Sequence, residues 1–245
     1  AVAELLKRRN VPVEWIDTAD LNKSIRLNCS LNGVAAATLN LAGGRRVSLA
    51  DFGTIWWRRP RRPVSESTVD DTTREFLRSE WEHFLGGLES FTEARWVNSP
   101  GASYLANRKA LQLVTANMVG LRVPRTAISN DPDAVRALAD KGAPLIYKRL
   151  GATARPVMIT RELLPEDLGR LSSLTSCPAI FQERIDARLD IRVTVMGDSL
   201  YAAEIDSQSG DAPLDWRLDH SVAMRPHTLD AQTATCLCAL MRRLG

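Results

Sequence analysis

The segment from residue 181 to 205 has the clearest alternation of apolar and polar positions in the chain. Between Asp190 and Val195 apolar and polar side chains alternate strictly, which is the two-residue period of a strand with one buried face. The residues from Gly197 to Ser199 are typical of a turn, and a second strand-like segment begins at Leu200. The pattern therefore predicts a β-hairpin with one apolar and one charged face.

The register of this hairpin depends on the length of its loop. A three-residue loop, Gly197 to Ser199, places Arg192 opposite Glu204 and Asp190 opposite Asp206. We expect this register, because a two-residue loop would put Glu204 among the apolar residues of the buried face. Two carboxylates that face each other are destabilising, so we also expect a cation or a hydrogen-bond donor beside them. A solvated face with one cross-strand ion pair is the alternative.

The rest of the pattern predicts helices that alternate with short strands. The predicted helices are 1–10, 70–91, 105–119, 132–142, 165–174 and 229–243. The predicted strands are 11–16, 26–31, 34–39, 47–49, 54–57, 144–148, 156–159 and 179–182, with a short one after Val123. Breaker residues at 98–101 indicate a boundary after an N-terminal part, 1–98. The further division into 99–178 and 179–245 is what the family resemblance given below implies.

Composition excludes several classes of protein. The net charge of +3 is too small to imply a nucleic-acid partner by itself. No apolar run is long enough to span a bilayer, so no membrane partner is expected. Cys236 and Cys238 lack a second pair of ligands nearby, which argues against zinc. The four cysteines are instead interpreted as free thiols of a cytoplasmic protein.

Two lysines and two carboxylates are candidate ligands for a nucleotide. Lys148 ends an apolar strand before the small residues 151–153, where it can place a charge on a phosphate. Lys109 opens a helix and, taken alone, is only a surface lysine. Glu183 and Asp190 flank a connector between strands, and they could bind an exocyclic amine and a ribose. Each of these residues also fits a plain solvated surface.

Together these segments resemble the ATP-grasp superfamily. The motifs that carry the resemblance are Asn107-Arg108-Lys109 with Gly120-Leu121-x-x-Pro124-x-Thr126, Tyr147-Lys148, Phe181 to Ile185, and Asp190 to Val193 with Gly197-Asp198. The last of these is similar to the branch that includes glutamate ligases acting on protein tails. Ile205 to Gln208 with Asp215-Trp216-Arg217, and Trp56 to Pro60 with Trp96 to Pro100, resemble the maturases of microviridin-type peptides, the graspetide synthetases.

The resemblance implies an α/β (α+β) ATP-grasp fold after a small α/β N-terminal domain. It implies a nucleotide-binding set of Lys109, Lys148, Gln182, Glu183, Arg184, Ile185 and Asp190. In this set the lysines bind phosphates, Glu183 meets the adenine amine, the backbone near Arg184 and Ile185 meets the ring edge, and Asp190 holds the ribose. It also implies catalytic roles for Arg192 and Arg217, and substrate contacts from Asp206, Asp215 and Trp216.

The implied reaction consumes ATP with Mg²⁺ and activates a side-chain carboxylate of a precursor peptide with a leader and an acidic core. A hydroxyl or amine of the same peptide then closes an ω-ester or ω-amide ring. The resemblance also suggests a homodimer. The magnesium ligands of this family are expected on strands beyond Gly245, so no metal ligand is named. Both ends interrupt helical patterns, so we expect the natural protein to extend further.

Two other functions fit the sequence. One is a glutamate-ligase-like enzyme that adds amino acids to a protein tail. The other is a catalytically inactive module that binds peptide or nucleic acid through the arginine-rich segment 58–62, which follows two tryptophans. The same segment could be an exposed linker after a buried strand.

Overall fold

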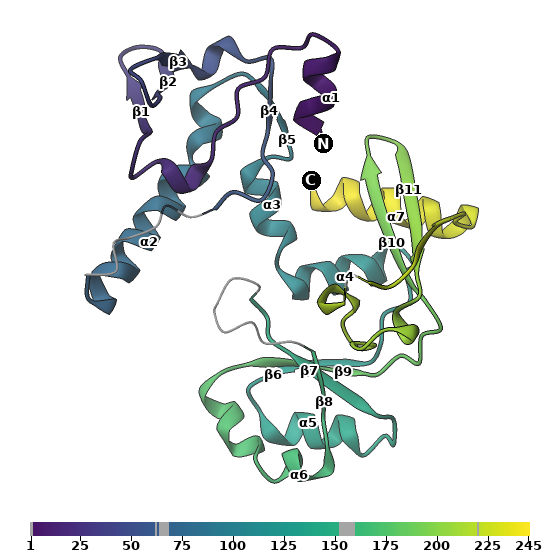
Figure 1. The fold of residues 1–245 in the computed structure, drawn as a ribbon. Coiled ribbons are helices and arrows are strands. Elements are labelled where there is room, and N and C mark those ends of the chain that lie inside the picture. The colour runs from purple at the N-terminus through teal and green to yellow at the C-terminus, as the bar shows by residue number, and fades with distance from the viewer. Residues whose placement is uncertain (1, 62, 64–68, 152–159, 220) are drawn as a thin grey trace. The chain divides into compact units, whose positions relative to one another are not determined.

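A computed structural model describes residues 2–61, 63, 69–151, 160–219 and 221–245. The chain divides into two compact units, Ala1–Ser103 and Tyr104–Gly245 (Figure 1). The predicted strand 156–159, most of the small-residue loop before it and Arg62 lie outside the described residues. Among the helices that are described, none is long and apolar enough to cross a membrane.

In its described residues, the first unit combines two α-helices and short 3-10 helices with two small sheets. Its elements are α1 Val2–Arg8, β1 Arg26–Leu31, β2 Ala35–Asn40, β3 Arg46–Ser48, β4 Thr54–Trp56, α2 Asp71–Gly86 and β5 Arg95–Val97. Strands β1, β2 and β3 form an antiparallel sheet, and β4 pairs with β5 in parallel. The core contains Ala37 and Leu39 from β2 and Leu85 from α2. These strands confirm the predicted α/β composition of this part.

The predicted strand 11–16 is wrong. These residues have no ladder partner in the described part of the chain, and Trp15 is 73% exposed. An apolar and polar alternation specifies a strand only where a neighbouring strand supplies hydrogen bonds, and none does so here.

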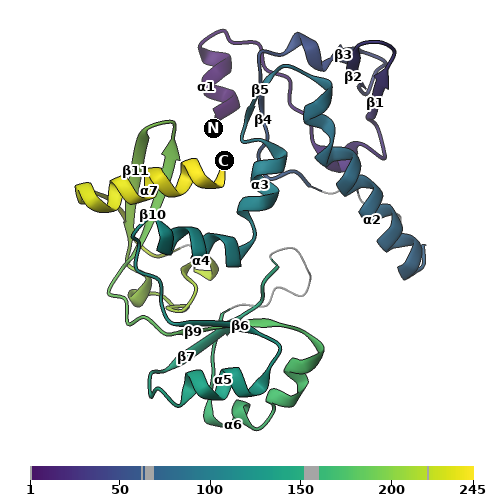
Figure 2. The same cartoon turned by 180° about the vertical axis from the view of Figure 1, so that it is seen from behind.

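The second unit contains a four-stranded antiparallel sheet in the order β6-β9-β7-β8. These strands are β6 Thr126–Ser129, β7 Leu145–Lys148, β8 Arg161–Glu162 and β9 Ala179–Glu183. Helix α5, Pro132–Ala139, covers one face, as Figures 1 and 2 both show. Asp131 caps its N-terminus and Pro132 fills its first turn, as predicted. The short helices α6, Pro165–Leu168, and η4, Leu171–Ser176, follow in place of one predicted helix.

The side chains of this sheet alternate between the α5 face and the opposite face. Leu145 and Phe181 pack in the core with Val135 of α5. Because neighbouring residues in a strand point to opposite faces, Lys148 and Gln182 share the face away from α5. Strand β9 lies between β6 and β7, so it belongs to this sheet, although the predicted division after residue 178 assigns it to the next part.

A second antiparallel sheet of the same unit has the order β10-β11-β12. Its strands are β10 Asp190–Met196, β11 Ser199–Ile205 and β12 Met224–His227. Helix α7, Ala231–Leu244, lies along one face, and a cavity between helix and sheet is lined by Ile191, Val193, His227, Leu229, Asp230, Thr233 and Leu237. Helix α4, Lys109–Met118, packs against α7, and α3, Pro100–Ala106, precedes α4.

The predicted three-residue loop of the hairpin is wrong. Met196 pairs with Ser199, so the loop contains only Gly197 and Asp198. Gly197 has a φ of +60°, which the first position of a type II′ turn requires and glycine supplies without strain. Glu204 consequently lies opposite Ile191, and Asp190 lies opposite Ile205.

The third strand explains why this register is stable. β12 had not been predicted, and it places Arg225 opposite Glu204. Nδ1 of His227 lies 3.2 Å from Oε2 of Glu204, within hydrogen-bond distance. The Glu204 carboxylate, which lies opposite the apolar Ile191, therefore has polar partners on the neighbouring strand β12. The expected pairs Arg192–Glu204 and Asp190–Asp206 do not form.

Candidate active site

A group of cationic side chains gathers in the second unit around the end of β7. Lys148 is the last residue of that strand, and Lys109 is the first residue of α4. Nζ of Lys109 donates a hydrogen bond to the carbonyl oxygen of Leu150 at 2.6 Å. The helix start and the strand end thus hold two ammonium groups near the same turn of chain.

The charges in this group act on one another. Burial lowers the pKa of Lys148 below its ordinary value, and the charges of Lys109 and Arg217 lower it further, while Asp215 opposes them. Burial also lowers the pKa of Lys109, and the positive charges of Arg149 and Arg217 lower it further. Positive charge therefore exceeds negative charge here, and an anionic ligand would relieve the repulsion.

Arg217 is held by a two-point ion pair with Asp215. Its Nε and one terminal nitrogen donate to the two carboxylate oxygens at 2.6 and 2.7 Å. The hydrogen bonds from Arg217 lower the pKa of the Asp215 carboxyl. The Asp215 side chain is 10% exposed whereas that of Arg217 is 70% exposed. The buried carboxylate therefore orients an accessible guanidinium.

Arg192 belongs to the same neighbourhood through Trp216. The guanidinium carbon of Arg192 lies 5.8 Å from the centroid of the Trp216 ring, within the range of a cation–π contact. Trp216 begins the short helix η6, Trp216–Leu218, directly after Asp215. Asp190 shares the sheet face of Arg192, because the two residues are two apart in β10. The structure thus brings together Arg192, Asp215, Trp216 and Arg217.

The predicted adenine hinge divides between two faces of the sheet. Gln182 is 3% exposed and lies on the Lys148 face, where its Nε2 donates to Oγ1 of Thr126 at 2.9 Å. Glu183 points to the α5 side, and Arg125 binds both of its carboxylate oxygens at 2.9 and 3.3 Å. Within the described residues the amide of Ile185 has no hydrogen-bond acceptor. The main chain of the hinge, rather than the Glu183 carboxylate, is therefore available to a ligand.

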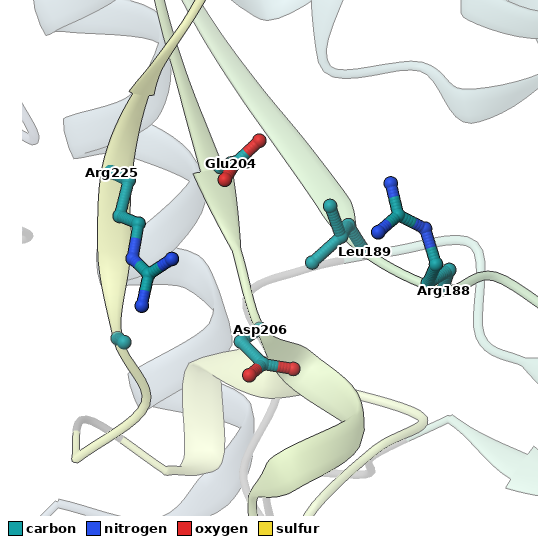
Figure 3. Close-up of a pocket in the computed structure, with 6 residues that line it drawn as sticks. Arg188, Leu189, Glu204, Asp206 and Arg225 are labelled. Atoms are coloured by element: carbon teal, nitrogen blue, oxygen red, sulfur yellow. The ribbon is translucent and has the colours of Figure 1, made fainter.

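Asp206 lies apart from the cationic group, in a cavity of about 230 Å³ (Figure 3). The cavity is lined by Arg188, Leu189, Glu204, Asp206, Ala223 and Arg225. Figure 3 shows Glu204 and Asp206 between Arg225 on β12 and Arg188 ahead of β10. Glu204 points to the sheet face opposite Arg192, because Arg192 pairs with its neighbour Ala203. The predicted placement of Glu204 opposite Arg192 is therefore wrong.

Several residues of this region had not been predicted. Arg125 precedes the motif residue Thr126, but its partner is far away in sequence, so no local pattern marks it. Arg225 and His227 belong to the strand that the pattern did not reveal. No group of three or more histidine, cysteine or acidic side chains that could hold a metal occurs in the described part of the chain.

No protein-family model and no curated protein sequence matches the chain. The chain is similar to the crystal structure of macrocyclase MdnC from Microcystis aeruginosa bound with precursor peptide MdnA, with a TM-score of 0.85 and 26% identity over 99% of this chain and 78% of that one. The chain is also similar to a RiPP-associated ATP-grasp ligase from Chryseobacterium gregarium in complex with ADP and a leader and core peptide. The TM-score is 0.83 and the identity 24%, over 99% of this chain and 77% of that one. A third similar structure is the ATP-grasp ligase PsnB complexed with a phosphomimetic variant of a minimal precursor, Mg and ADP. Its TM-score is 0.72 and its identity 23%, over 100% of this chain and 76% of that one.

These likenesses confirm the predicted ATP-grasp fold, including the small α/β part that precedes it. They also confirm the resemblance to ATP-grasp maturases of ribosomally made peptides. The predicted site residues and domain limits remain predictions.

Proposed function

We propose that this chain is an ATP-dependent ligase that closes ω-ester or ω-amide rings in a ribosomally made precursor peptide. The observation that carries the proposal is the group of Lys109, Lys148 and Arg217, whose mutual repulsion is suited to a polyanion. The likeness to macrocyclase MdnC at 26% identity supports a peptide as the second substrate.

ATP fits this site by charge and by hydrogen bonding. Lys148 and Lys109 would bind the phosphates, and Asp190 the ribose. The main chain from Glu183 to Ile185 would form hydrogen bonds with the adenine edge. Gln182 lies on the same sheet face as Lys148. The Mg²⁺ ion would accompany the phosphates, because magnesium is commonly held through substrate phosphates and few protein ligands.

Arg192 and Arg217 would stabilise the charge that develops during phosphoryl transfer. A peptide carboxylate attacks the γ-phosphorus of ATP, and the bond to the β-phosphate oxygen breaks, which gives an acyl phosphate and ADP. A hydroxyl or amine of the same peptide then attacks the acyl carbon and phosphate leaves, so each ring costs one water from the peptide. Guanidinium groups stabilise the negative charge on the transferring phosphoryl group without any covalent step.

The substrate side of the proposal involves Asp206, Asp215 and Trp216. Asp215 and Trp216 adjoin the two arginines, and Asp206 belongs to the separate cavity beside β11. A leader, an acidic core, a homodimer and action in the cytoplasm are parts of the same proposal. The cysteines of the described chain are free, which fits a reducing compartment.

The test is to incubate the protein with ATP, Mg²⁺ and the precursor peptide encoded beside it. We expect ADP release and the loss of one water mass per ring, and Lys148→Ala should strongly reduce both. A gain of amino-acid mass would favour the glutamate-ligase-like alternative. Retained peptide or RNA binding without nucleotide affinity would favour the inactive module and contradict the proposal.

A further inference from the structure

Arg125 and Glu183 are joined through both their side chains and their main chains. Nε of Arg125 donates to one carboxylate oxygen at 2.9 Å, and its terminal nitrogen donates to the other at 3.3 Å. The amide of Glu183 donates to the carbonyl oxygen of Arg125 at 2.9 Å. The last residue of β9 is thus fixed to the residue just before β6.

A second set of bonds fixes the same place from the other face of the sheet. Gln182 donates to Oγ1 of Thr126 at 2.9 Å, and that hydroxyl donates to the carbonyl oxygen of Pro124 at 2.7 Å. The end of β9 is therefore clamped to residues 124–126 on both faces. The buried set lies on the Lys148 face, and the Arg125 pair lies on the α5 face.

Beyond Glu183 the chain is fixed by hydrogen bonds and ion pairs at Arg184, and the next residue is exposed to solvent. The amide of Arg184 donates to the carbonyl oxygen of Pro144 at 2.8 Å, and its guanidinium pairs with Glu162 at 2.9 Å and with Asp186 at 3.1 Å. Ile185 is 61% exposed. The main chain that would read a base is thus placed by the clamp and by Arg184.

We propose that Arg125 is a positioning residue for nucleotide binding, which holds the main chain of Glu183 to Ile185 where it meets the base. This inference rests on the proposed function. The Arg125 and Glu183 side chains are 43% and 30% exposed, and such an exposed pair contributes little to folding stability. Its two-point geometry nevertheless fixes the carboxylate in orientation as well as in distance.

The charge state of the pair agrees with this role. The hydrogen bonds from Arg125 lower the pKa of the Glu183 carboxyl, so the pair is ionised at neutral pH. A carboxylate engaged in this way is not released to contact the base as an independent side chain. Glu183 therefore acts through its backbone and through its pair with Arg125.

The test compares nucleotide binding by full-chain variants, with ATP and GTP titrated calorimetrically. Arg125→Gln should raise the Kd for ATP about three- to tenfold and narrow the preference for ATP over GTP. Glu183→Gln should do the same, and the double variant should be no worse than either alone. The swap Arg125→Glu with Glu183→Arg should recover part of the affinity.

Arg136→Gln is the matched control. Arg136 also makes an exposed ion pair, with Asp133 at 2.6 Å on α5, and it lies outside the hinge. It should change thermal stability as little as Arg125→Gln does and leave both Kd values unchanged. An unchanged ATP affinity in Arg125→Gln, or an equal loss in Arg136→Gln, would overturn the inference. If the wild-type chain binds no ATP, the proposed function itself fails.

Discussion

Lys109 donates its ammonium hydrogen bond to the carbonyl oxygen of Leu150, two residues after Lys148. A lysine at the start of α4 is thereby tied to the chain that leaves β7, and the two ammonium groups lie within electrostatic reach. Neither is neutralised by a carboxylate of its own among the ion pairs of the described residues. Under the proposed function, ATP affinity should be the property most sensitive to substitution of these two lysines.

Lys148→Ala should raise the Kd for ATP about tenfold to a hundredfold, the effect of losing one charged hydrogen bond. Lys141→Ala is the control, because Lys141 is exposed near the end of α5. Equilibrium titration with ATP checks both variants. An affinity unchanged in Lys148→Ala would remove the basis for placing the phosphates here.

ATP binding should be accompanied by proton uptake at alkaline pH. The pKa of Lys148 is lowered in the free protein, mainly by burial, and a bound phosphate would raise it again. Between the lowered and the ordinary pKa the free lysine is neutral, so binding must add a proton. Calorimetry in buffers of different ionisation enthalpy measures this uptake. Lys148→Met should reduce it, and the remainder should come from Lys109, whose pKa is also lowered.

The same pKa shift has a defined consequence for stability. A lysine whose folded-state pKa is lowered destabilises the fold while it is charged. Stability should therefore rise as the pH increases from the folded-state pKa of Lys148 toward its unfolded value. Lys148→Met should be more stable than the wild type below that window, and a less stable variant would contradict this sign.

Much of the fold was predictable because its signals are local. The cap at Asp131 and the proline after it predict α5, and the apolar run that ends at Lys148 predicts β7. The hairpin register was missed although Gly197-Asp198 fits a two-residue turn, because Glu204 was not expected among apolar residues. Its partner His227 lies on β12, which no local signal predicted. The segment 11–16 failed for the converse reason, because its alternation has no neighbouring strand.

The candidate site shows the same limit. Lys109, Lys148 and Arg217 follow from motifs of the ATP-grasp resemblance, and the structure brings them together. Arg125 follows from no motif, because its role depends on a contact with Glu183 that only the folded sheet creates.

Gly197→Ala should destabilise the hairpin by about 1 kcal/mol, because an alanine at a φ of +60° is strained. An added Cβ meets nothing within 4 Å there, so the cost is conformational only. Gly169→Ala is the control, with a φ of −70° and ordinary helical geometry. Hydrogen exchange of residues 190–205 should quicken in the first variant and stay unchanged in the second.

Trp216→Leu should lower the catalytic rate by weakening the placement of Arg192. A cation–π contact contributes about 0.5–2 kcal/mol, so kcat/KM should fall about two- to thirtyfold. Trp216→Phe keeps an aromatic face and should lose less. Equal losses in the two variants would show that the ring acts by another means than its contact with Arg192.

Asp215→Asn should impair catalysis while ATP binding falls much less. The carboxylate is nearly buried and holds Arg217 at two points, whereas an amide offers one acceptor and no charge. Arg217 lowers the pKa of Asp215, so this pair contributes stability above the ordinary aspartate pKa and loses it as the pH falls through the lowered one. The wild type should therefore lose more stability on acidification than Asp215→Asn, by about 1 kcal/mol at most because Arg217 is exposed. Product formation, ATP titration and urea unfolding at neutral and acidic pH separate these effects. A full rate in Asp215→Asn would mean that Arg217 needs no such orientation.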